Sequence, residues 1–310
     1  MLLSLPRQRC THFQPSKLFL RLHLKKWKSS ASAALAAKKR LGLALPALDN
    51  LCSRKDRECE LEQSLMGIVE DCRQEKILFL GLDISTRVSG YGLLDANGVG
   101  VCCSAIKTSA VDVVDIGNEI STFLSSRVDP IMSSAKYSDY ELNIIFEDCM
   151  TSFSPGKFNA RGLMKLAQVN GVARYAVWSR YGIRPSLIHP SAARHFFQLM
   201  RATEQKKEPV KERVFNYVTA YAPDLPWLDQ GKGVAYDKTD AYLVAMYARA
   251  MYFKKSILSS ADMWEKLGVH PSILQEEGRG PHRKLSMEIL DKAVMEWLKH
   301  RRRDVGLGLD

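Results

Sequence analysis

The stretch of sequence that decides the fold is Ile77-Leu78-Phe79-Leu80-Gly81-Leu82-Asp83. Its apolar residues follow one another without polar alternation, which predicts a strand that is covered on both faces of a sheet. The run ends in an acid, so Asp83 lies at the carboxyl end of the predicted strand. Ligands of open α/β sheets collect at that edge, and Asp83 is therefore the first candidate site residue.

The following segments predict three further strands and a helix. Residues 89–95 and 100–107 are typical of strands, and the turn signal Asp95-Ala96-Asn97-Gly98 joins them. Together with the first strand they predict an antiparallel meander. A helix is expected over residues 112–134, where apolar residues recur at helical spacing. Leu142–Glu147 is a second apolar run that ends in an acid.

The rest of the sequence alternates helix and strand. Helices are expected over residues 159–181, 191–199, 208–221 and 236–253, with a short strand over residues 185–188. The order of these elements predicts an α/β fold in which helices cover the faces of a mixed five-stranded sheet. The remaining tail is expected to hold one or two more helices, such as Ser286 to Lys299, before the basic run His300–Arg303.

Four acids form the candidate active site. Asp83 and Glu147 end predicted strands, whereas Asp237 and Asp240 are three residues apart and share one face of the last helix. Four carboxylates that meet in space repel one another unless a cation lies between them. Their oxygens suit Mg²⁺, with Mn²⁺ as a substitute, and two such ions can activate water for phosphodiester hydrolysis. Taken singly, an acid at the end of a strand is more commonly a helix cap or a turn residue than a catalytic one.

Most of the positive charge is concentrated at the N-terminus. Residues 1–48 contain ten Lys or Arg and no acid, and so account for +10 of the formal net charge of +11. Apolar residues interrupted by basic ones are typical of an organellar transit peptide. The Lys and Arg content favours the mitochondrion, with the chloroplast as the alternative. A basic tail without a targeting role is the other interpretation.

These patterns divide the 310 residues into four parts. We expect a transit peptide over residues 1–48, a linker or leading helix over 49–76, a nuclease domain over 77–253, and a helical extension with a basic end over 254–310. No apolar run reaches the roughly 18–20 residues needed to span a bilayer, so no membrane partner is expected. The seven cysteines include no C-x-x-C pair, which argues against a zinc site.

A second basic feature is the stretch from Cys149 to Thr203, which contains eight Lys or Arg and no acid. It directly follows Glu147, and basic residues without compensating acids beside a metal site favour contacts with nucleic-acid phosphates. A solvated charged face is the alternative interpretation. The candidate DNA-binding residues, from this stretch and from the segments before Asp237, are Lys157, Arg161, Lys165, Lys207, Lys211 and Lys232.

Two aromatic residues lie in the expected loop after Glu147. Phe153 and Phe158 are candidates for wedges that enter an opened base stack. Packing of these rings on the core is an equally good interpretation.

Five segments resemble motifs of the RuvC-type nucleases. Residues 77–92, ILFLGLDISTRVSGYG, resemble the first motif, with its strand-end Asp and the following Ser-Thr and Gly. Phe146-Glu147 resembles the second motif, and Lys165–Gly171, KLAQVNG, is similar to a helix of the family. His189–Arg194, HPSAAR, resembles a short strand-to-helix turn, and Asp237–Ala241, DKTDA, resembles the closing Asp-x-x-Asp-Ala motif.

This resemblance, which covers about residues 77–253, implies a ribonuclease H-like fold. It also implies a homodimer that resolves four-way (Holliday) DNA junctions by paired, symmetric nicks, here in organellar DNA. The chain departs from the family by extra residues after Glu147 and by a longer loop before Asp237.

Two other functions stay open at the level of the sequence. One is a nuclease or binding protein of the same fold that acts on RNA or on RNA–DNA hybrids. The other is an ATP-dependent phosphotransferase of the actin and sugar-kinase type, which also begins with a strand, an Asp and a phosphate-binding turn. Such enzymes need a second, duplicated domain, for which the chain after residue 77 is too short.

Overall fold

The structure is a computed structural model that describes residues 54–108, 112–148, 160–200, 208–260, 291–292 and 294–308. The chain divides into two compact units, Met1–Glu58 and Cys59–Asp310, and the fold described here is that of the second. The predicted transit peptide, residues 1–48, lies outside the described residues.

The centre of the fold is a mixed five-stranded sheet in the order β3-β2-β1-β4-β5. The strands are β1 (Ile77–Asp83), β2 (Val88–Asp95), β3 (Gly100–Lys107), β4 (Glu141–Glu147) and β5 (Ser186–Ile188). β1, β2 and β3 form an antiparallel meander, whereas β4 runs parallel to β1, and β5 runs parallel to β4. The predicted fold class, a ribonuclease H-like mixed sheet flanked by helices, is confirmed.

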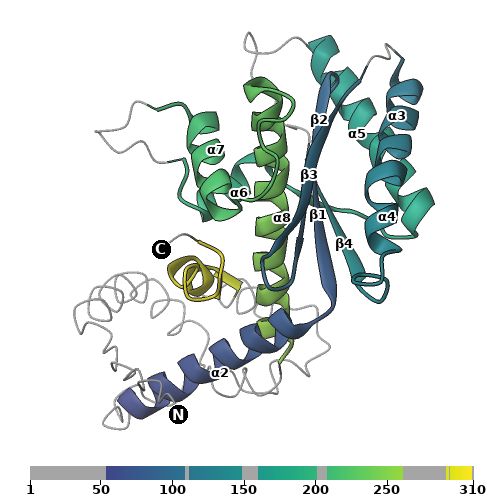
Figure 1. The fold of residues 1–310 in the computed structure, drawn as a ribbon. Coiled ribbons are helices and arrows are strands. Elements are labelled where there is room, and N and C mark those ends of the chain that lie inside the picture. The colour runs from purple at the N-terminus through teal and green to yellow at the C-terminus, as the bar shows by residue number, and fades with distance from the viewer. Residues whose placement is uncertain are drawn as a thin grey trace, which may run out of the picture. The chain divides into compact units, whose positions relative to one another are not determined.

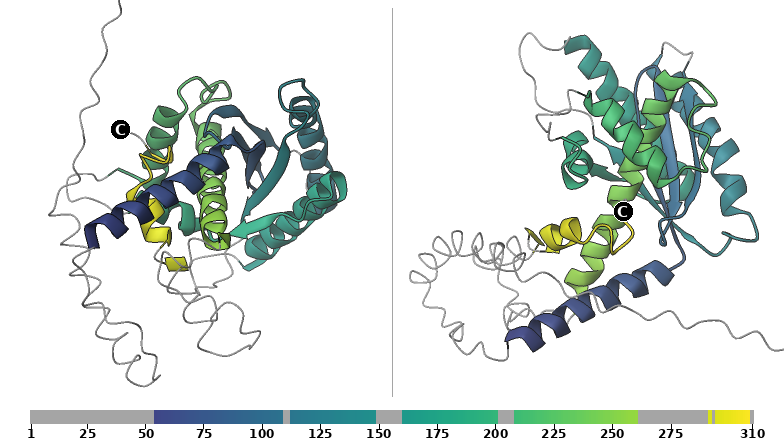
Figure 2. Two further views of the ribbon diagram at one scale, coloured as in Figure 1. Left: turned by 90° about the horizontal axis from the view of Figure 1, so that it is seen from below. Right: turned by 60° about the vertical axis from the view of Figure 1, so that its left-hand side comes forward.

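Helices cover both faces of this sheet (Figures 1 and 2). Helices α3, α4 and α5 lie on one face, and α8, together with α6 and α7, lies on the other. The helix bounds are α2 (Arg54–Gln74), α3 (Val113–Arg127), α4 (Asp129–Met132), α5 (Ala160–Tyr181), α6 (Pro190–Phe196), α7 (Val210–Tyr221) and α8 (Lys232–Ser259). Among the described helices, none combines the length and the apolar character needed to cross a bilayer.

The apolar run of β1 serves two cores. Leu78, Leu80 and Leu82 are buried in the core that lies against α3 and α5. Ile77 and Phe79 point to the opposite face and are buried in the core that contains α8. Because neighbouring side chains of a strand point to opposite faces, a strand covered on both sides must be apolar at every position, as the sequence predicts.

Three glycines let α8 lie directly on the sheet. A Cβ added at Gly81 would clash with the backbone of α8 at Ala241, and one added at Gly90 would clash with the Asp237 carbonyl. A Cβ at Gly92 would meet Tyr242, with 2.8 Å to its Cβ. The absence of side chains at these positions brings the first half of α8 against β1 and β2.

Two helices differ from their predicted bounds. The helix expected over residues 112–134 is interrupted at Val128, and Pro130 lies within the first turn of α4. Proline lacks a backbone N–H and its ring clashes with the preceding turn, which explains the interruption. Helix α8 begins at Lys232, four residues earlier than predicted, directly after Gly231, whose φ of 90° favours glycine.

The described part of the C-terminal segment belongs to the core on the α8 side. Residues 291–292 and 294–300 are helical, which overlaps the helix predicted over Ser286 to Lys299 and extends one residue past its end. Four of its apolar side chains are buried there: Val294, Leu298, Val305 and Leu307.

Candidate active site

The four predicted site acids are positioned at the carboxyl edge of the sheet. β1 ends at Asp83, and its parallel neighbour β4 ends beside it at Glu147. Asp237 and Asp240 lie in the first turns of α8. Gly90 is the cross-strand partner of Asp83 and packs on the backbone of Asp237. The strand ends and the close packing of α8 together define the site.

The end of β4 is held from both sides. Asn170 of α5 is buried, and its Nδ2 donates a hydrogen bond to the backbone carbonyl of Glu147 at 3.1 Å. On the other side Glu147 is paired with Ile188 of β5, and the backbone N–H of Asp148 donates to the Ile188 carbonyl at 2.8 Å. These contacts fix the backbone that carries the Glu147 carboxylate.

Burial, and then repulsion by neighbouring carboxylates, raises the pKa values of three of the acids. Burial, followed by the charges of Asp240 and Asp237, raises the pKa of Asp83 to about 7. Burial and the charge of Asp83 raise the pKa of Glu147 to about 8. The pKa of Asp237 is raised by burial, with a smaller contribution from Asp240. Raised values of this kind, caused by like charges in a partly desolvated place, mark a site that favours an added cation.

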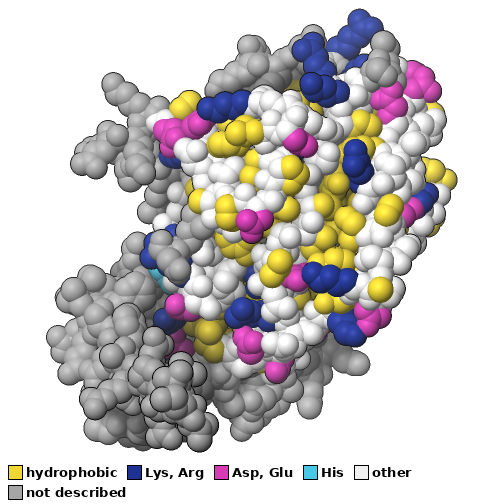
Figure 3. All heavy atoms as spheres, in the orientation of Figure 1, with side chains coloured by type: hydrophobic (Ala, Val, Ile, Leu, Met, Phe, Trp, Pro, Cys, Tyr) yellow, Lys and Arg dark blue, Asp and Glu magenta, His cyan; other side chains and the backbone are white. Residues whose placement is uncertain are grey.

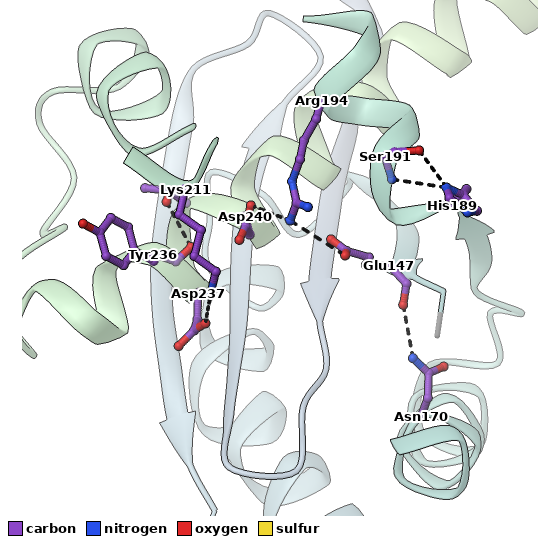
Figure 4. A network of polar contacts seen from close by, with 10 residues as sticks. Glu147, Asn170, His189, Ser191, Arg194, Lys211, Tyr236, Asp237 and Asp240 are labelled. Atoms are coloured by element: carbon purple, nitrogen blue, oxygen red, sulfur yellow. Dashed lines mark hydrogen bonds and ion pairs between the residues drawn. The ribbon is translucent and has the colours of Figure 1, made fainter. Parts of the chain in front are cut away.

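Arg194 of α6 supplies one cation to this site (Figure 4). Its Nη2 donates a hydrogen bond to Oδ1 of Asp240 at 3.0 Å and lies 3.9 Å from Oε1 of Glu147. Burial lowers the pKa of the guanidinium, but the charges of Asp240 and Glu147 and the hydrogen bond to Asp240 together outweigh burial, so this pKa is raised. His189 caps the N-terminus of α6 by accepting a hydrogen bond from the Ser191 backbone N–H, and so orients the helix that carries Arg194.

A second group of charges lies where α7 meets the start of α8. Nζ of Lys211 is 4.0 Å from Oδ1 of Asp237. Glu212 accepts hydrogen bonds from Nζ of Lys232, at 3.0 Å, and from the Tyr236 hydroxyl. Lys211 is therefore directed at the acids, whereas Lys232 is paired with α7.

Lys238 lies between the two acids of α8 in sequence but points away from them. Its side chain is fully buried and donates to the Pro226 carbonyl at 3.0 Å and to Asp229. It thereby ties the loop between α7 and α8 to the first turns of α8, and the position of Asp237 depends on this loop.

The donor set at the edge of the sheet fits Mg²⁺ or Mn²⁺ in its chemistry, since it consists of carboxylate oxygens, and the pKa values of Asp83, Glu147 and Asp237 are raised. As the side chains lie in this structure, no three Asp, Glu, His or Cys residues of the described ranges are gathered into a ready-made metal cage. The Arg194 guanidinium lies between two of the acids instead. To bind a metal ion, the carboxylate side chains would have to move closer together, and the Arg194 guanidinium would have to release its contacts with Asp240 and Glu147.

Two solved structures are similar to this chain. T. thermophilus RuvC in complex with a Holliday junction substrate matches with a TM-score of 0.35 and 12% identity, over 62% of this chain and 97% of that one. The yeast mitochondrial Holliday junction resolvase Ydc2 matches with a TM-score of 0.40 and 12% identity, over 66% of this chain and 90% of that one. No protein-family model and no curated protein matches the chain. Because both TM-scores are below 0.5, the case for a function rests on the residues of this chain.

The structure positions some of the predicted DNA-binding residues and not others. Arg161 and Lys165 lie in the first turns of α5, and the densest group of Lys and Arg side chains in Figure 3 lies at the end of the molecule where α5 begins. Lys211 reaches Asp237, as described above. The remaining candidates, Lys157, Lys207, Phe153 and Phe158, lie outside the described residues.

Two residues that contact the acids were not predicted to do so. Arg194 was part of the acid-free basic stretch and of the HPSAAR segment, and Asn170 was part of the KLAQVNG segment. Both segments can be recognised as motifs in the sequence, but neither motif indicates which of its side chains points towards Glu147 or Asp240. Only the packing of α5 and α6 at the sheet edge reveals this.

Proposed function

We propose that this protein is a metal-dependent DNA endonuclease that resolves four-way junctions by paired symmetric nicks. The observation that carries the proposal is the placement of Arg194 between Asp240 and Glu147, beside the strand end that carries Asp83, at the carboxyl edge of the sheet. An acidic cluster that contains one partly exposed cation can hold divalent ions and can also attract a phosphodiester.

Each acid has a distinct role in this proposal. Asp83, Glu147 and Asp240 would hold two Mg²⁺ ions, and Asp237 would ligate an ion or orient the attacking water. Bound Mg²⁺ supplies charge that activates water and stabilises the leaving 3′-oxygen. Arg194, whose pKa is raised at the site, stays charged and can donate to a non-bridging phosphate oxygen, but it does not act as a proton donor.

The substrate and the assembly follow from the chemistry and from the sequence resemblance. Arg161, Lys165 and Lys211 are proposed to contact the phosphates of the junction arms. Lys211 lies 4.0 Å from Asp237, and Arg161 and Lys165 lie on α5, the helix whose Asn170 contacts Glu147. Two symmetric nicks require two active sites, and we therefore infer a homodimer. The acid-free N-terminus favours action on mitochondrial DNA, with the chloroplast as the alternative.

The test is cleavage of a synthetic four-way junction by the wild type and by Asp83→Asn, with Mg²⁺ or with EDTA. We expect the wild type to cut only with Mg²⁺, and Asp83→Asn to lose at least about 100-fold in rate, more than is typical for loss of a residue that only supports a metal ligand. The variant should still bind the junction. Asp115→Asn, which removes an exposed acid of α3, is the matched control and should cleave normally.

The rival functions are distinguished by the substrate. Junction, duplex DNA, RNA–DNA hybrid and RNA should be compared under the same conditions, and preference for the hybrid or for RNA would replace the junction as the substrate. A phosphotransferase of the actin type is already disfavoured, because the described residues form a single five-stranded sheet without a duplicate. Undiminished nicking by Asp83→Asn would show that the acids are not the active site.

A further inference from the structure

The two acids of α8 are separated by a lysine that no step of the proposed chemistry uses. Lys238 lies between Asp237 and Asp240 in the sequence, and its side chain has no exposed surface. Its Nζ donates to the Pro226 carbonyl at 3.0 Å and to the Asp229 carboxylate. Lysine is almost never fully buried unless it is paired, so these two contacts explain how the side chain can lie inside the fold.

Both acceptors belong to the loop between α7 and α8, residues 222–231. This loop is the longer segment before the last motif, in which the chain departs from the RuvC-type nucleases. It is held against α8 by Trp227, which is buried, donates from Nε1 to the Ala222 carbonyl at 2.7 Å, and packs on the Tyr242 ring with centroids 5.3 Å apart. The loop is therefore packed firmly enough to support the lysine.

The sheet supports α8 closely, but at three positions without side chains. A Cβ at Gly81, Gly90 or Gly92 would clash with the α8 backbone. Glycines let the helix come near, but they carry no side chains that interdigitate with it and fix its rotation. Two side chains of α8, Lys232 and Tyr236, are paired with α7, and both lie ahead of the acids. The rotation of the helix where it carries the acids therefore depends on further contacts.

One such contact is the hydrogen bond from Arg194 to Asp240, at 3.0 Å. It must be released when a divalent ion takes the place of the guanidinium between Asp240 and Glu147. The contacts of Lys238 involve neither acid, so they persist when an ion binds. They hold the helix in the state in which Arg194 no longer does.

We propose that Lys238 is a positioning residue which, supported by the 222–231 loop, fixes the rotation of α8 and so holds Asp237 and Asp240 where they can bind a divalent ion. The proposal rests on the proposed function, since it concerns the acids of that active site. Lys238 itself touches neither the ion nor DNA, because it is fully buried and directed away from the acids. Loss of a residue that supports metal ligands typically lowers metal affinity by about 10- to 100-fold.

The decisive variant is Lys238→Met in the full chain. Methionine is unbranched and apolar, so it can follow the buried path of the lysine stem. The former partner, Asp229, is 45% exposed, and no buried charge is left without a partner. The Tm in EDTA should therefore stay within about 3 °C of the wild type.

Two measurements on Lys238→Met should nevertheless change. Amide hydrogen exchange in EDTA should be at least about ten-fold faster over residues 226–240, because the loop and the start of α8 are no longer tied together. The Kd for Mg²⁺, from calorimetry at pH 8.5, should rise at least about ten-fold. The kcat at saturating Mg²⁺ should change little, because the residue acts on the ligands and not on the phosphate.

The matched control is Lys254→Met on the same helix. Nζ of Lys254 lies 2.7 Å from Asp291, whose side chain is 46% exposed, so this substitution removes a similar ion pair from the other half of α8. It should change neither the Mg²⁺ affinity nor the exchange over residues 226–240. Asp229→Asn breaks the Lys238 pair from its exposed side and leaves the lysine buried with one carbonyl, so its Tm should fall below that of Lys238→Met.

The outcomes separate this proposal from the proposed function. Wild-type Mg²⁺ affinity and exchange in Lys238→Met would overturn the positioning role, even if Asp83→Asn abolishes cleavage. A large fall in Tm, with faster exchange across the whole sheet, would show that the lysine only stabilises the fold. If Lys238→Met does not fold, Asp229→Asn decides, and wild-type Mg²⁺ binding by that variant would overturn the proposal. A wild type that does not cut the junction would contradict the proposed function, whereas the calorimetry and exchange need no DNA and still test Lys238.

Discussion

The Arg194 guanidinium donates to Oδ1 of Asp240 at 3.0 Å and at the same time lies 3.9 Å from Oε1 of Glu147. One fixed positive charge therefore lies where the carboxylates would receive a divalent ion. Two unit charges about 4 Å apart near a protein surface interact by about 4 kcal/mol before screening by salt. Arg194 thus stabilises the acids without metal and competes with the metal for them.

Replacing Arg194 by Gln should separate metal binding from cleavage. At pH 8.5, where the acids are largely ionised, we expect Mg²⁺ affinity measured by calorimetry to rise about ten-fold, because the competing charge is gone. The cleavage rate should nevertheless fall by about 100-fold, since the phosphate loses a positioned donor. Arg184→Gln, which removes an exposed arginine before β5, is the control and should change neither quantity. Weaker Mg²⁺ binding by the Arg194 variant would show that the guanidinium supports the metal site.

The raised pKa values predict how stability depends on pH. Asp83 and Glu147 titrate at about 7 and about 8 in the folded chain, but near 3.8 and 4.5 when unfolded. Between about pH 4 and pH 8 the folded state therefore holds more protons than the unfolded state, and these two groups lower stability as the pH rises. In EDTA, Tm should fall from pH 5 to pH 8.5, and Mg²⁺ should restore it mainly at the higher pH.

The neutral variant Asp83→Asn isolates this effect from other titrating groups. It removes one buried charge and lowers the repulsion on Glu147, so its Tm in EDTA should exceed that of the wild type at pH 8.5 and match it more closely at pH 5. An equal or steeper decline of Tm with pH in this variant would show that the pH dependence arises elsewhere.

Gly90→Ala tests whether the close approach of α8 builds the site. The added Cβ would clash with the Asp237 carbonyl, so α8 must move away from Asp83. We expect the free energy of unfolding in urea to fall by about 1–3 kcal/mol or more, together with a loss of Mg²⁺ affinity. Gly67→Ala in α2 meets no neighbour and should instead be neutral or stabilising by up to about 1 kcal/mol.

The sequence predicted the parts of this molecule that are decided locally. The run ILFLGLD identified β1 because both faces of that strand are covered, and the strand-end acids Asp83 and Glu147 follow from such runs directly. Their roles as metal ligands stay predictions. The interruption at Val128 was missed although Pro130 signals it, because the helical spacing of apolar residues continues across the break.

Other features depend on contacts between distant segments, and the local sequence does not state what these residues contact. Gly90 is a strand residue in the sequence, and only the packing of α8 shows why it lacks a side chain. The basic residue Arg194 is one of eight in an acid-free stretch, and nothing in the spacing of that stretch distinguishes the one that reaches Asp240. Arg194 reaches Asp240 because α6 follows directly after β5 and carries this side chain to the edge of the sheet.

The C-terminal segment should be essential for stability and dispensable for the chemistry. Arg249 is fully buried in α8, and its Nε and Nη1 donate to the carbonyls of Ala96 and Gly306 at 2.7 and 2.9 Å. The Tyr221 hydroxyl also donates to Gly306, at 2.8 Å. Deleting residues 301–310 would remove the Gly306 carbonyl, so Nη1 of Arg249 and the Tyr221 hydroxyl would lose their acceptor. The deletion would also remove the buried Leu307 side chain.

We therefore expect this truncation to lower the free energy of unfolding in urea by several kcal/mol, since each unsatisfied buried group costs about 1–3 kcal/mol. Tyr221→Phe, which removes one hydrogen bond, should cost about 1 kcal/mol, and Tyr175→Phe, at an exposed ring on α5, should cost almost nothing. The truncated protein should still cut the junction at low temperature, because no described residue of the segment is among the site contacts of Arg194, Glu147 or Asp240. A truncated chain that is fully stable but inactive would reverse this assignment and place the basic end of the chain on the DNA.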